Sequence, residues 1–155
     1  MQFLVFHLGD DRYGLHTRTV VRVLPLMELK HIPQAPQYVA GLMNLHGEPV
    51  PVIDLCMLAC GTACTRQYDT RIVLVDYRAG SGRQRKLGLA VERVTGIERH
   101  EAAEFSESGI LNADAPYLGQ VGAAGRALLQ LVNVDYLLTD QVRSLLFPDP
   151  AAANP

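Results

Sequence analysis

Residues 41–55 read Gly-Leu-Met-Asn-Leu-His-Gly-Glu-Pro-Val-Pro-Val-Ile-Asp-Leu, and this stretch decides the fold class of the chain. Two apolar runs flank Gly47-Glu48, and a turn-forming pair between apolar runs is typical of paired strands. Prolines at 49 and 51 exclude a helix here, because proline blocks the helix interior. Their presence also predicts that Pro49–Leu55 is an edge strand or the start of a strand.

Short strand-like segments continue on both sides of this stretch. They are Gln2–Leu8, Tyr13–Leu15, Leu26–Ile32, Thr70–Tyr77, Leu87–Val94, Tyr117–Val121 and Ala127–Val132. Glycine, proline or polar clusters separate them, which favours hairpins over βαβ units. Sustained helical spacing is found in Thr139–Phe147, with one helical turn at Asp135–Leu138 before it. The pattern predicts a mainly all-β fold with few short helices and a C-terminal helix.

Composition narrows the function classes. The 155 residues include 14 Lys and Arg against 16 Asp and Glu, a net charge of −2, and 48% are hydrophobic. A nucleic-acid binder would carry a basic excess, so we expect no nucleic-acid partner. No apolar run approaches the roughly 20 residues of a membrane span, and no signal peptide is evident, so we expect a cytoplasmic protein without membrane insertion.

Three cysteines, Cys56, Cys60 and Cys64, are spaced four residues apart. On a helix they would share one face and suggest a metal site. Gly61 and Thr62 interrupt such a helix, and common metal motifs have a fourth ligand and different spacing. The odd number fits unpaired thiols in a reducing compartment better than a disulfide framework. We therefore expect no metal at this position, and a small metal-binding protein remains an alternative.

Asp54 raises a second alternative. Asp10 and Asp11 follow one apolar run and Asp54 ends another, as in phosphoacceptor regulators that hold Mg²⁺ beside a phosphorylated aspartate. Such a fold needs amphipathic helices between these strands, and the prolines and glycines of residues 13–53 prevent them. Serine-hydrolase and phosphate-loop motifs are absent as well. The residues predict a binding protein with no catalytic residues and no cofactor.

Several motifs together resemble the CheW family, the coupling proteins of bacterial chemosensory arrays. The motifs are Phe6-His-Leu-Gly-Asp-Asp-Arg-Tyr-Gly14, Ile32-Pro-Gln-Ala-Pro36 through Asp54-Leu55, Arg71-Ile-Val-Leu-Val75, Leu87-Gly-Leu-Ala-Val91, Tyr117-Leu-Gly-Gln-Val-Gly122 and Leu129-Gln-Leu-Val-Asn-Val-Asp135. The resemblance covers about Phe3 to Leu138. Its most specific part is Gly-x-x-Asn-x-x-Gly-x-x-x-Pro-x-x-Asp-Leu, which begins at Gly41.

The resemblance implies two small five-stranded SH3-like β-barrels that share one core, with residues 1–147 as a single domain and 148–155 as a disordered tail. It also implies a non-catalytic adaptor. Its partners would be the cytoplasmic tip of a methyl-accepting chemoreceptor and the regulatory domain of a CheA-type histidine kinase. Its location would be cytoplasmic, at membrane-associated receptor arrays.

The resemblance also implies receptor-contact positions, namely Val20, Arg22, Gly41, Asn44 and His46. Val20 would supply apolar contact and Gly41 a close backbone approach, although an ordinary core valine and a strained turn are equally open readings. Kinase-contact residues are not indicated. This chain has His46 where the family usually has arginine, and Arg22 where it often has an acidic residue. Both changes alter charge at contact positions and suggest a divergent array, such as a surface-sensing or twitching system.

Overall fold

The computed structural model describes residues 1–65, 69–78, 83–107, 109, 113–123 and 127–148. Its strands are β1 (Gln2–Leu8), β2 (Asp11–His16), β3 (Val20–Pro25), β4 (Val39–Leu45), β5 (Glu48–Asp54), β6 (Arg71–Arg78), β7 (Gln84–Arg99), β8 (Phe105–Ser106), β9 (Leu118–Gly122) and β10 (Leu129–Val132). The α-helices are α1 (Leu55–Cys60) and α2 (Asp140–Leu146), and the 3₁₀ turns are η1 (Thr17–Thr19), η2 (Ala102–Glu104) and η3 (Val134–Tyr136). Among the described residues, no helix is long and apolar enough to cross a bilayer.

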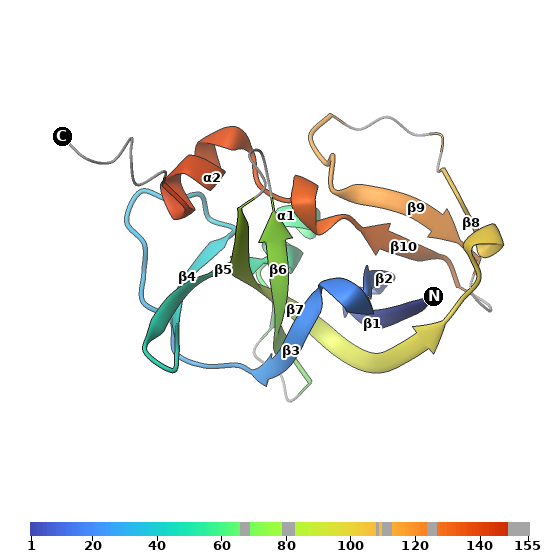
Figure 1. The fold of residues 1–155 in the computed structure, drawn as a ribbon, viewed down its shortest axis with the longest axis horizontal. Coiled ribbons are helices and arrows are strands. Elements are labelled where there is room, and N and C mark those ends of the chain that lie inside the picture. Colours follow the sequence, from blue (N-terminus) through green and yellow to red (C-terminus); the bar gives the residue numbers. More distant parts are fainter. Residues whose placement is uncertain (66–68, 79–82, 108, 110–112, 124–126, 149–155) are drawn as a thin grey trace.

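The strands form two barrels that lie side by side (Figure 1). The first contains β3, β6, the N-terminal half of β7, β5 and β4, in that hydrogen-bonded order. A bridge between Lys30 and Leu42 connects the segment after β3 to β4. The second contains the C-terminal half of β7, then β1, β2, β10 and β9, with the two-residue β8 at its edge.

Strand β7 joins the two barrels. Gln84 to Val91 pair with β6, and Glu92 to Arg99 pair with β1. The change of partner coincides with a register shift in β1 and with a positive φ of 44° at Arg93. A bulge at such a point bends the strand, so one continuous strand can serve both barrels.

One large core underlies both barrels. It unites buried side chains from β1 and β2 with buried side chains from β5, β6 and β7, including Phe6, Leu15, Ile53, Val73 and Leu89. Two smaller clusters fill the individual barrels, one around Met43 and Val52, the other around Phe3 and Phe105. This arrangement confirms the expected barrels with a shared core and makes them one packing unit.

Three strand expectations need correction. Leu26–Ile32 forms no strand beyond the bridge at Lys30. Pro49–Leu55 was expected as an edge strand or the start of a strand. The edge is wrong, since β5 lies between β4 and β7, but the strand start is correct, since β5 begins at Glu48 and β7 pairs only with Val52–Asp54. Both prolines therefore lie before the part of β5 that is paired on both sides. In this singly paired part the N–H that proline lacks is not needed for a second strand. β7 also extends well past Val94.

The hairpins β1–β2 and β9–β10 confirm the expected pairing. The C-terminal helix is present as α2, with the Thr139 hydroxyl accepting a hydrogen bond from the Val142 amide at 3.2 Å. The expected single turn before it is η3. Most of the Arg78–Lys86 loop tip, part of the Ile110–Pro116 loop and the tail beyond Pro148 lie outside the described residues.

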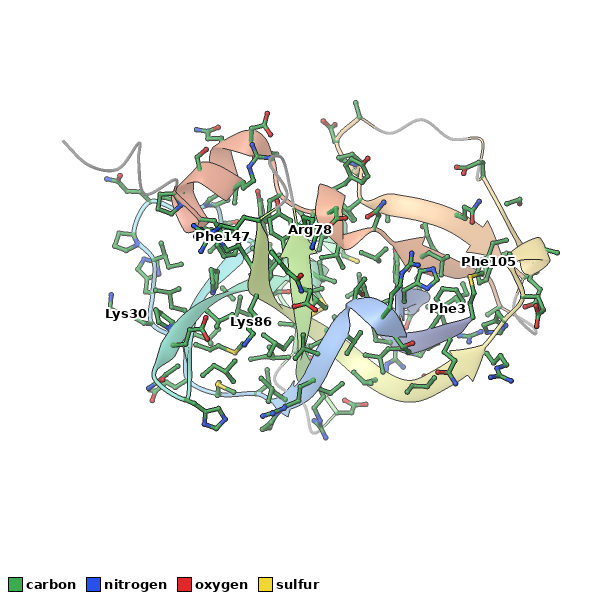
Figure 2. The ribbon with its side chains drawn as sticks, viewed as in Figure 1. Phe3, Lys30, Arg78, Lys86, Phe105 and Phe147 are labelled. Atoms are coloured by element: carbon green, nitrogen blue, oxygen red, sulfur yellow. A yellow bond between two sulfur atoms is a disulfide. The ribbon has the colours of Figure 1, made fainter. Side chains whose placement is uncertain are left out.

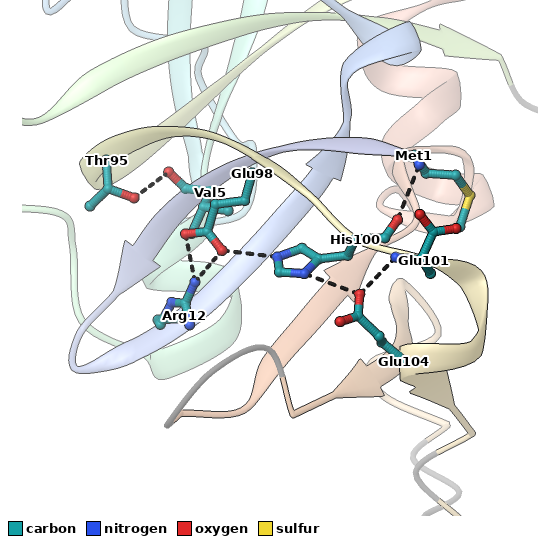
Figure 3. A network of polar contacts seen from close by, with 8 residues as sticks. All are labelled: Met1, Val5, Arg12, Thr95, Glu98, His100, Glu101 and Glu104. Atoms are coloured by element: carbon teal, nitrogen blue, oxygen red, sulfur yellow. Dashed lines mark hydrogen bonds and ion pairs between the residues drawn. The ribbon is translucent and has the colours of Figure 1, made fainter.

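A polar network secures the second barrel (Figure 3). The Arg12 guanidinium donates to both oxygens of Glu98, at 2.8 and 2.7 Å, and Glu98 also contacts the His100 ring at 2.9 Å. His100 reaches Glu104 at 3.3 Å, and the amino group of Met1 donates to the His100 carbonyl at 3.0 Å. The network ties the N-terminus, β2 and the end of β7 together.

Candidate functional site: exposed surfaces for protein partners

Strand β3 presents apolar side chains to solvent. Val20 is half-buried, while Val21 and Val23 are 45% and 39% exposed and Arg22 is exposed between them. A register shift between Val20 and Arg22, paired to β6, breaks the usual alternation, so three consecutive side chains reach the surface. Val20 thus packs against the core and is also partly exposed to solvent. Arg22 lies on the surface, where a partner protein could reach it.

Gly41 has a structural reason to be glycine. It is buried on β4 at a φ of 146°, which L side chains rarely adopt. A Cβ atom built there would lie 2.6 Å from the carbonyl oxygen of Lys30. The close backbone approach expected of Gly41 is therefore present, but its partner is the chain's own segment after β3.

Asn44 and His46 belong to the turn between β4 and β5. The Asn44 side-chain oxygen accepts a hydrogen bond from the Gly47 amide at 2.7 Å, which fixes the turn. His46 has a positive φ of 51°, and both side chains are exposed. The turn holds the His46 ring on the outside of the first barrel.

The five residues fall into two groups on one barrel. Val20 and Arg22 are on β3, and Gly41, Asn44 and His46 are on β4 and its turn. β3 and β4 are the two end strands of the first barrel's sheet, linked through the Lys30–Leu42 bridge. Both groups therefore belong to the first barrel, on its two end strands and the turn after β4.

The sequence did not reveal a groove that lies between the β4–β5 hairpin, the paired ends of β6 and β7, and the end of α2. It has a volume of about 630 Å³ and an apolar lining from Leu42, Pro49, Pro51 and Phe147. Glu48, Asp76, Arg85 and Lys86 surround this lining with charge, and Lys86 lies 4.0 Å from Glu48. Figure 2 labels Lys86 and Phe147 at this end of the barrel.

The groove has a clear cause in the sequence. The first half of β5 pairs with β4 alone because β7 pairs only with Val52–Asp54, so Pro49 is exposed, and Pro51, although buried, lines the groove. Phe147 follows α2 and stacks on Tyr77 of β6, with ring centroids 5.6 Å apart. Prolines in a strand, together with an apolar end to the last helix, were the sequence features that could have indicated it.

A second groove of about 530 Å³ lies over the second barrel beside η1. Its lining is mostly polar and includes His16, Arg18, Gln120 and Asp135. Burial and the nearby positive charge of Arg18 lower the pKa of His16 below its ordinary value, which favours the neutral ring. Arg18 and Thr19 of η1 line this groove, and η1 leads directly into β3.

Asp54 is a structural carboxylate. It caps α1 by accepting the Met57 amide at 3.0 Å, and it also accepts the Cys64 amide at 3.0 Å. Its strand lies in a barrel instead of the parallel sheet that a phosphoacceptor regulator requires. The phosphoacceptor alternative for Asp54 is therefore wrong.

The cysteines also differ from expectation. Cys56 and Cys64 form a disulfide with a Cα–Cα distance of 5.2 Å, and Cys60 alone is unpaired and exposed. The expected interruption at Gly61 is correct, since this residue ends α1 in the left-handed conformation. That same turn brings Cys64 back against Cys56, which spacing alone does not show. Asp54 lies beside both sulfurs, but sulfurs bonded to each other offer no thiolate to a metal.

The fold and these surfaces define a double-barrel module for binding other proteins. The family model described as CheW-like domain matches residues 2–142, and the chain belongs to this family. It is therefore a non-catalytic scaffold of chemotaxis-type signalling.

Relatives support the same assignment. The chain is 26% identical over 151 residues to the chemotaxis protein CheW of Klebsiella aerogenes, covering 94% of this chain and 86% of that protein. It is 28% identical over 141 residues to protein FrzA of Myxococcus xanthus, covering 88% and 84%. The crystal structure of the scaffolding protein TtCheW from Thermoanaerobacter tengcongensis has a similar fold, with a TM-score of 0.78 and 22% identity, covering 91% of this chain and 89% of that one.

Proposed function

We infer that this chain couples the cytoplasmic tip of a chemoreceptor to the regulatory domain of a CheA-type histidine kinase, in a cytoplasmic array beside the membrane. The family supports the general scaffold role. The observation that carries the receptor side is the exposed apolar face of β3, where Val21 and Val23 remain open to solvent around Arg22. A helical receptor hairpin needs such an apolar surface with polar residues beside it.

Within this role, Val20, Arg22, Asn44 and His46 are the proposed receptor contacts. Gly41 contributes through the fold, because it sets the approach of β4 to the segment after β3. His46 and Arg22 are exposed, so their departure from the family's usual charges faces a partner directly. Charge complementarity at an interface selects among partners. We therefore propose a divergent array, such as one for surface sensing or twitching.

The test is co-purification of the full chain with a receptor cytoplasmic fragment and a kinase. Val23→Glu places a charge on the apolar face of β3 without touching the core, and should weaken receptor binding about tenfold or more. Ile97→Glu is the matched control, because Ile97 is 61% exposed but lies on β7 in the second barrel. Both variants should keep the wild-type circular dichroism spectrum.

Failure of the wild-type chain to form a ternary complex would exclude the coupling role. Equal receptor binding by Val23→Glu and Ile97→Glu would exclude β3 as a receptor contact but would leave the coupling role standing. Pull-down against the host's different receptors tests the divergent array. Preference for the flagellar receptors would contradict that part of the proposal.

A further inference from the structure

The Cys56–Cys64 bond encloses one compact segment, the helix α1 and the turn after it. Cys56 is 2% exposed and belongs to the core shared by the barrels, whereas Cys64 is only partly buried. Cys64 also lies against β7, with its sulfur 3.4 Å from the Ala90 carbonyl oxygen. The bond thus connects the shared core to a segment near the surface.

The two cysteines are positioned by groups other than their sulfurs. The Asp54 carboxylate accepts the amide of Met57, in the first turn of α1, and the amide of Cys64. The next residue, Thr65, donates its amide to Glu92 at 3.0 Å. Because these hydrogen bonds hold both ends of the segment, the fold can keep the two sulfurs adjacent when both are thiols.

The third cysteine is set apart. Cys60 is exposed at the end of α1, and burial together with the nearby carboxylates of Asp11 and Glu92 raises the pKa of its thiol. A thiol that stays protonated is a poor nucleophile. The Cys60 sulfur also lies beside β1, 4.0 Å from the Leu8 carbonyl oxygen, whereas the Cys64 sulfur lies beside Ala90 of β7. Position and pKa together leave Cys60 outside the exchange.

We propose that Cys56 and Cys64 form a reversible thiol–disulfide pair that stiffens the chain on oxidation, with Cys64 as the sulfur that reacts first and Cys60 outside the reaction. In a reducing cytoplasm the pair is held as thiols, and a hydroperoxide is the oxidant that closes it. The proposal is independent of the receptor and kinase roles.

The chemistry proceeds in two balanced steps. Cys64 loses its thiol proton and the thiolate attacks the peroxide. The O–O bond breaks, Cys64 becomes a sulfenic acid, and the departing hydroxide takes up the proton and leaves as one water. The Cys56 thiol then attacks this sulfur, the S–O bond breaks, and the disulfide forms with release of a second water. Two thiols lose two electrons, and the peroxide gains them.

The first measurement counts thiols. The full chain is reduced with dithiothreitol or oxidised with hydrogen peroxide, unfolded, alkylated and weighed by mass spectrometry. The reduced chain should carry three adducts and the oxidised chain one. The Cys60→Ser variant should carry two adducts when reduced and none when oxidised. Cys64→Ser should carry two adducts in both conditions. Cys56→Ser should carry two adducts when reduced and one when oxidised, because its Cys64 sulfenic acid has no thiol partner.

The second measurement is thermal unfolding. Closing so short a loop should raise the Tm of the oxidised chain by roughly 5–10 °C over the reduced chain, and dithiothreitol should reverse the rise. Cys60→Ser should keep this difference and Cys64→Ser should lose it. Because Cys64 is only partly buried, this variant should fold even if Cys56→Ser does not. Three adducts after oxidation, a bond that includes Cys60, or equal Tm values would overturn the proposal.

Discussion

At the scale of single residues, the sequence singled out Gly41 but left open why glycine is needed there. A receptor contact and a strained turn both require glycine, and only the position of the Lys30 carbonyl distinguishes them. That carbonyl comes from a segment without regular strand structure, so no periodicity could have indicated it. Gly41 is a structural residue first, and a receptor contact there stays a prediction.

Gly41→Ala should destabilise the fold by about 2–3 kcal/mol, because the added Cβ meets the Lys30 oxygen and the residue also needs a positive φ. Gly47→Ala is the matched control. Gly47 has a φ of 90° but open space around it, so only the backbone cost of about 1 kcal/mol should remain. Urea unfolding measures both values. Equal losses would show that the collision with Lys30 is relieved elsewhere.

Glu98 should make the stability of the second barrel depend on pH. Burial alone would raise the pKa of Glu98, but hydrogen bonds from His100 and Arg12 outweigh it and hold the pKa below the ordinary carboxyl value. Such a carboxylate stabilises the fold above its unfolded pKa, and the contribution is lost as pH falls through the folded pKa. Wild type should exceed Glu98→Gln in Tm at pH 7, and the gap should close below about pH 4. A constant gap from pH 7 to 3 would contradict this.

At the scale of elements, local patterns worked where a hairpin or a capped helix closes on itself. β1–β2, β9–β10 and α2 each depend on neighbours a few residues away. The sequence failed for elements defined by distant partners. β7 was expected to end at Val94, yet pairing with β1 carries it to Arg99. The segment Leu26–Ile32 is apolar enough for a strand but has only a single bridge as partner.

Helix α2 offers a test at this scale. The Thr139 hydroxyl caps its first turn, and the helix packs through Val142, which is 5% exposed. Thr139→Ala should lower stability by about 1 kcal/mol, whereas Thr139→Ser keeps the acceptor oxygen and should change it by a few tenths. Urea unfolding again gives the measurement. A loss shared by both variants would point to the methyl group of Thr139 instead of its hydroxyl.

At the scale of the whole molecule, the shared core should make both barrels unfold together. Leu89, fully buried on β7, packs in the same cluster as Phe6 of β1. Leu89→Ala should cost about 2–5 kcal/mol and shift one cooperative transition to lower urea, with far-ultraviolet circular dichroism and tyrosine signals changing at the same midpoint. Two separate midpoints would show that the barrels fold independently.

The sequence by itself determined the class of fold, the near-neutral and non-catalytic character, and the family. Turn residues, strand alternation and the placement of prolines are local properties, and all three can be read directly from the stretch Gly41 to Leu55. Tertiary structure alone decided which surfaces stay open and which cysteines pair. The groove beside Phe147 and the Cys56–Cys64 bond each join residues through turns and incomplete pairing. Contacts of this kind depend on the path of the backbone in three dimensions, and neither the spacing of residues nor the composition predicts that path.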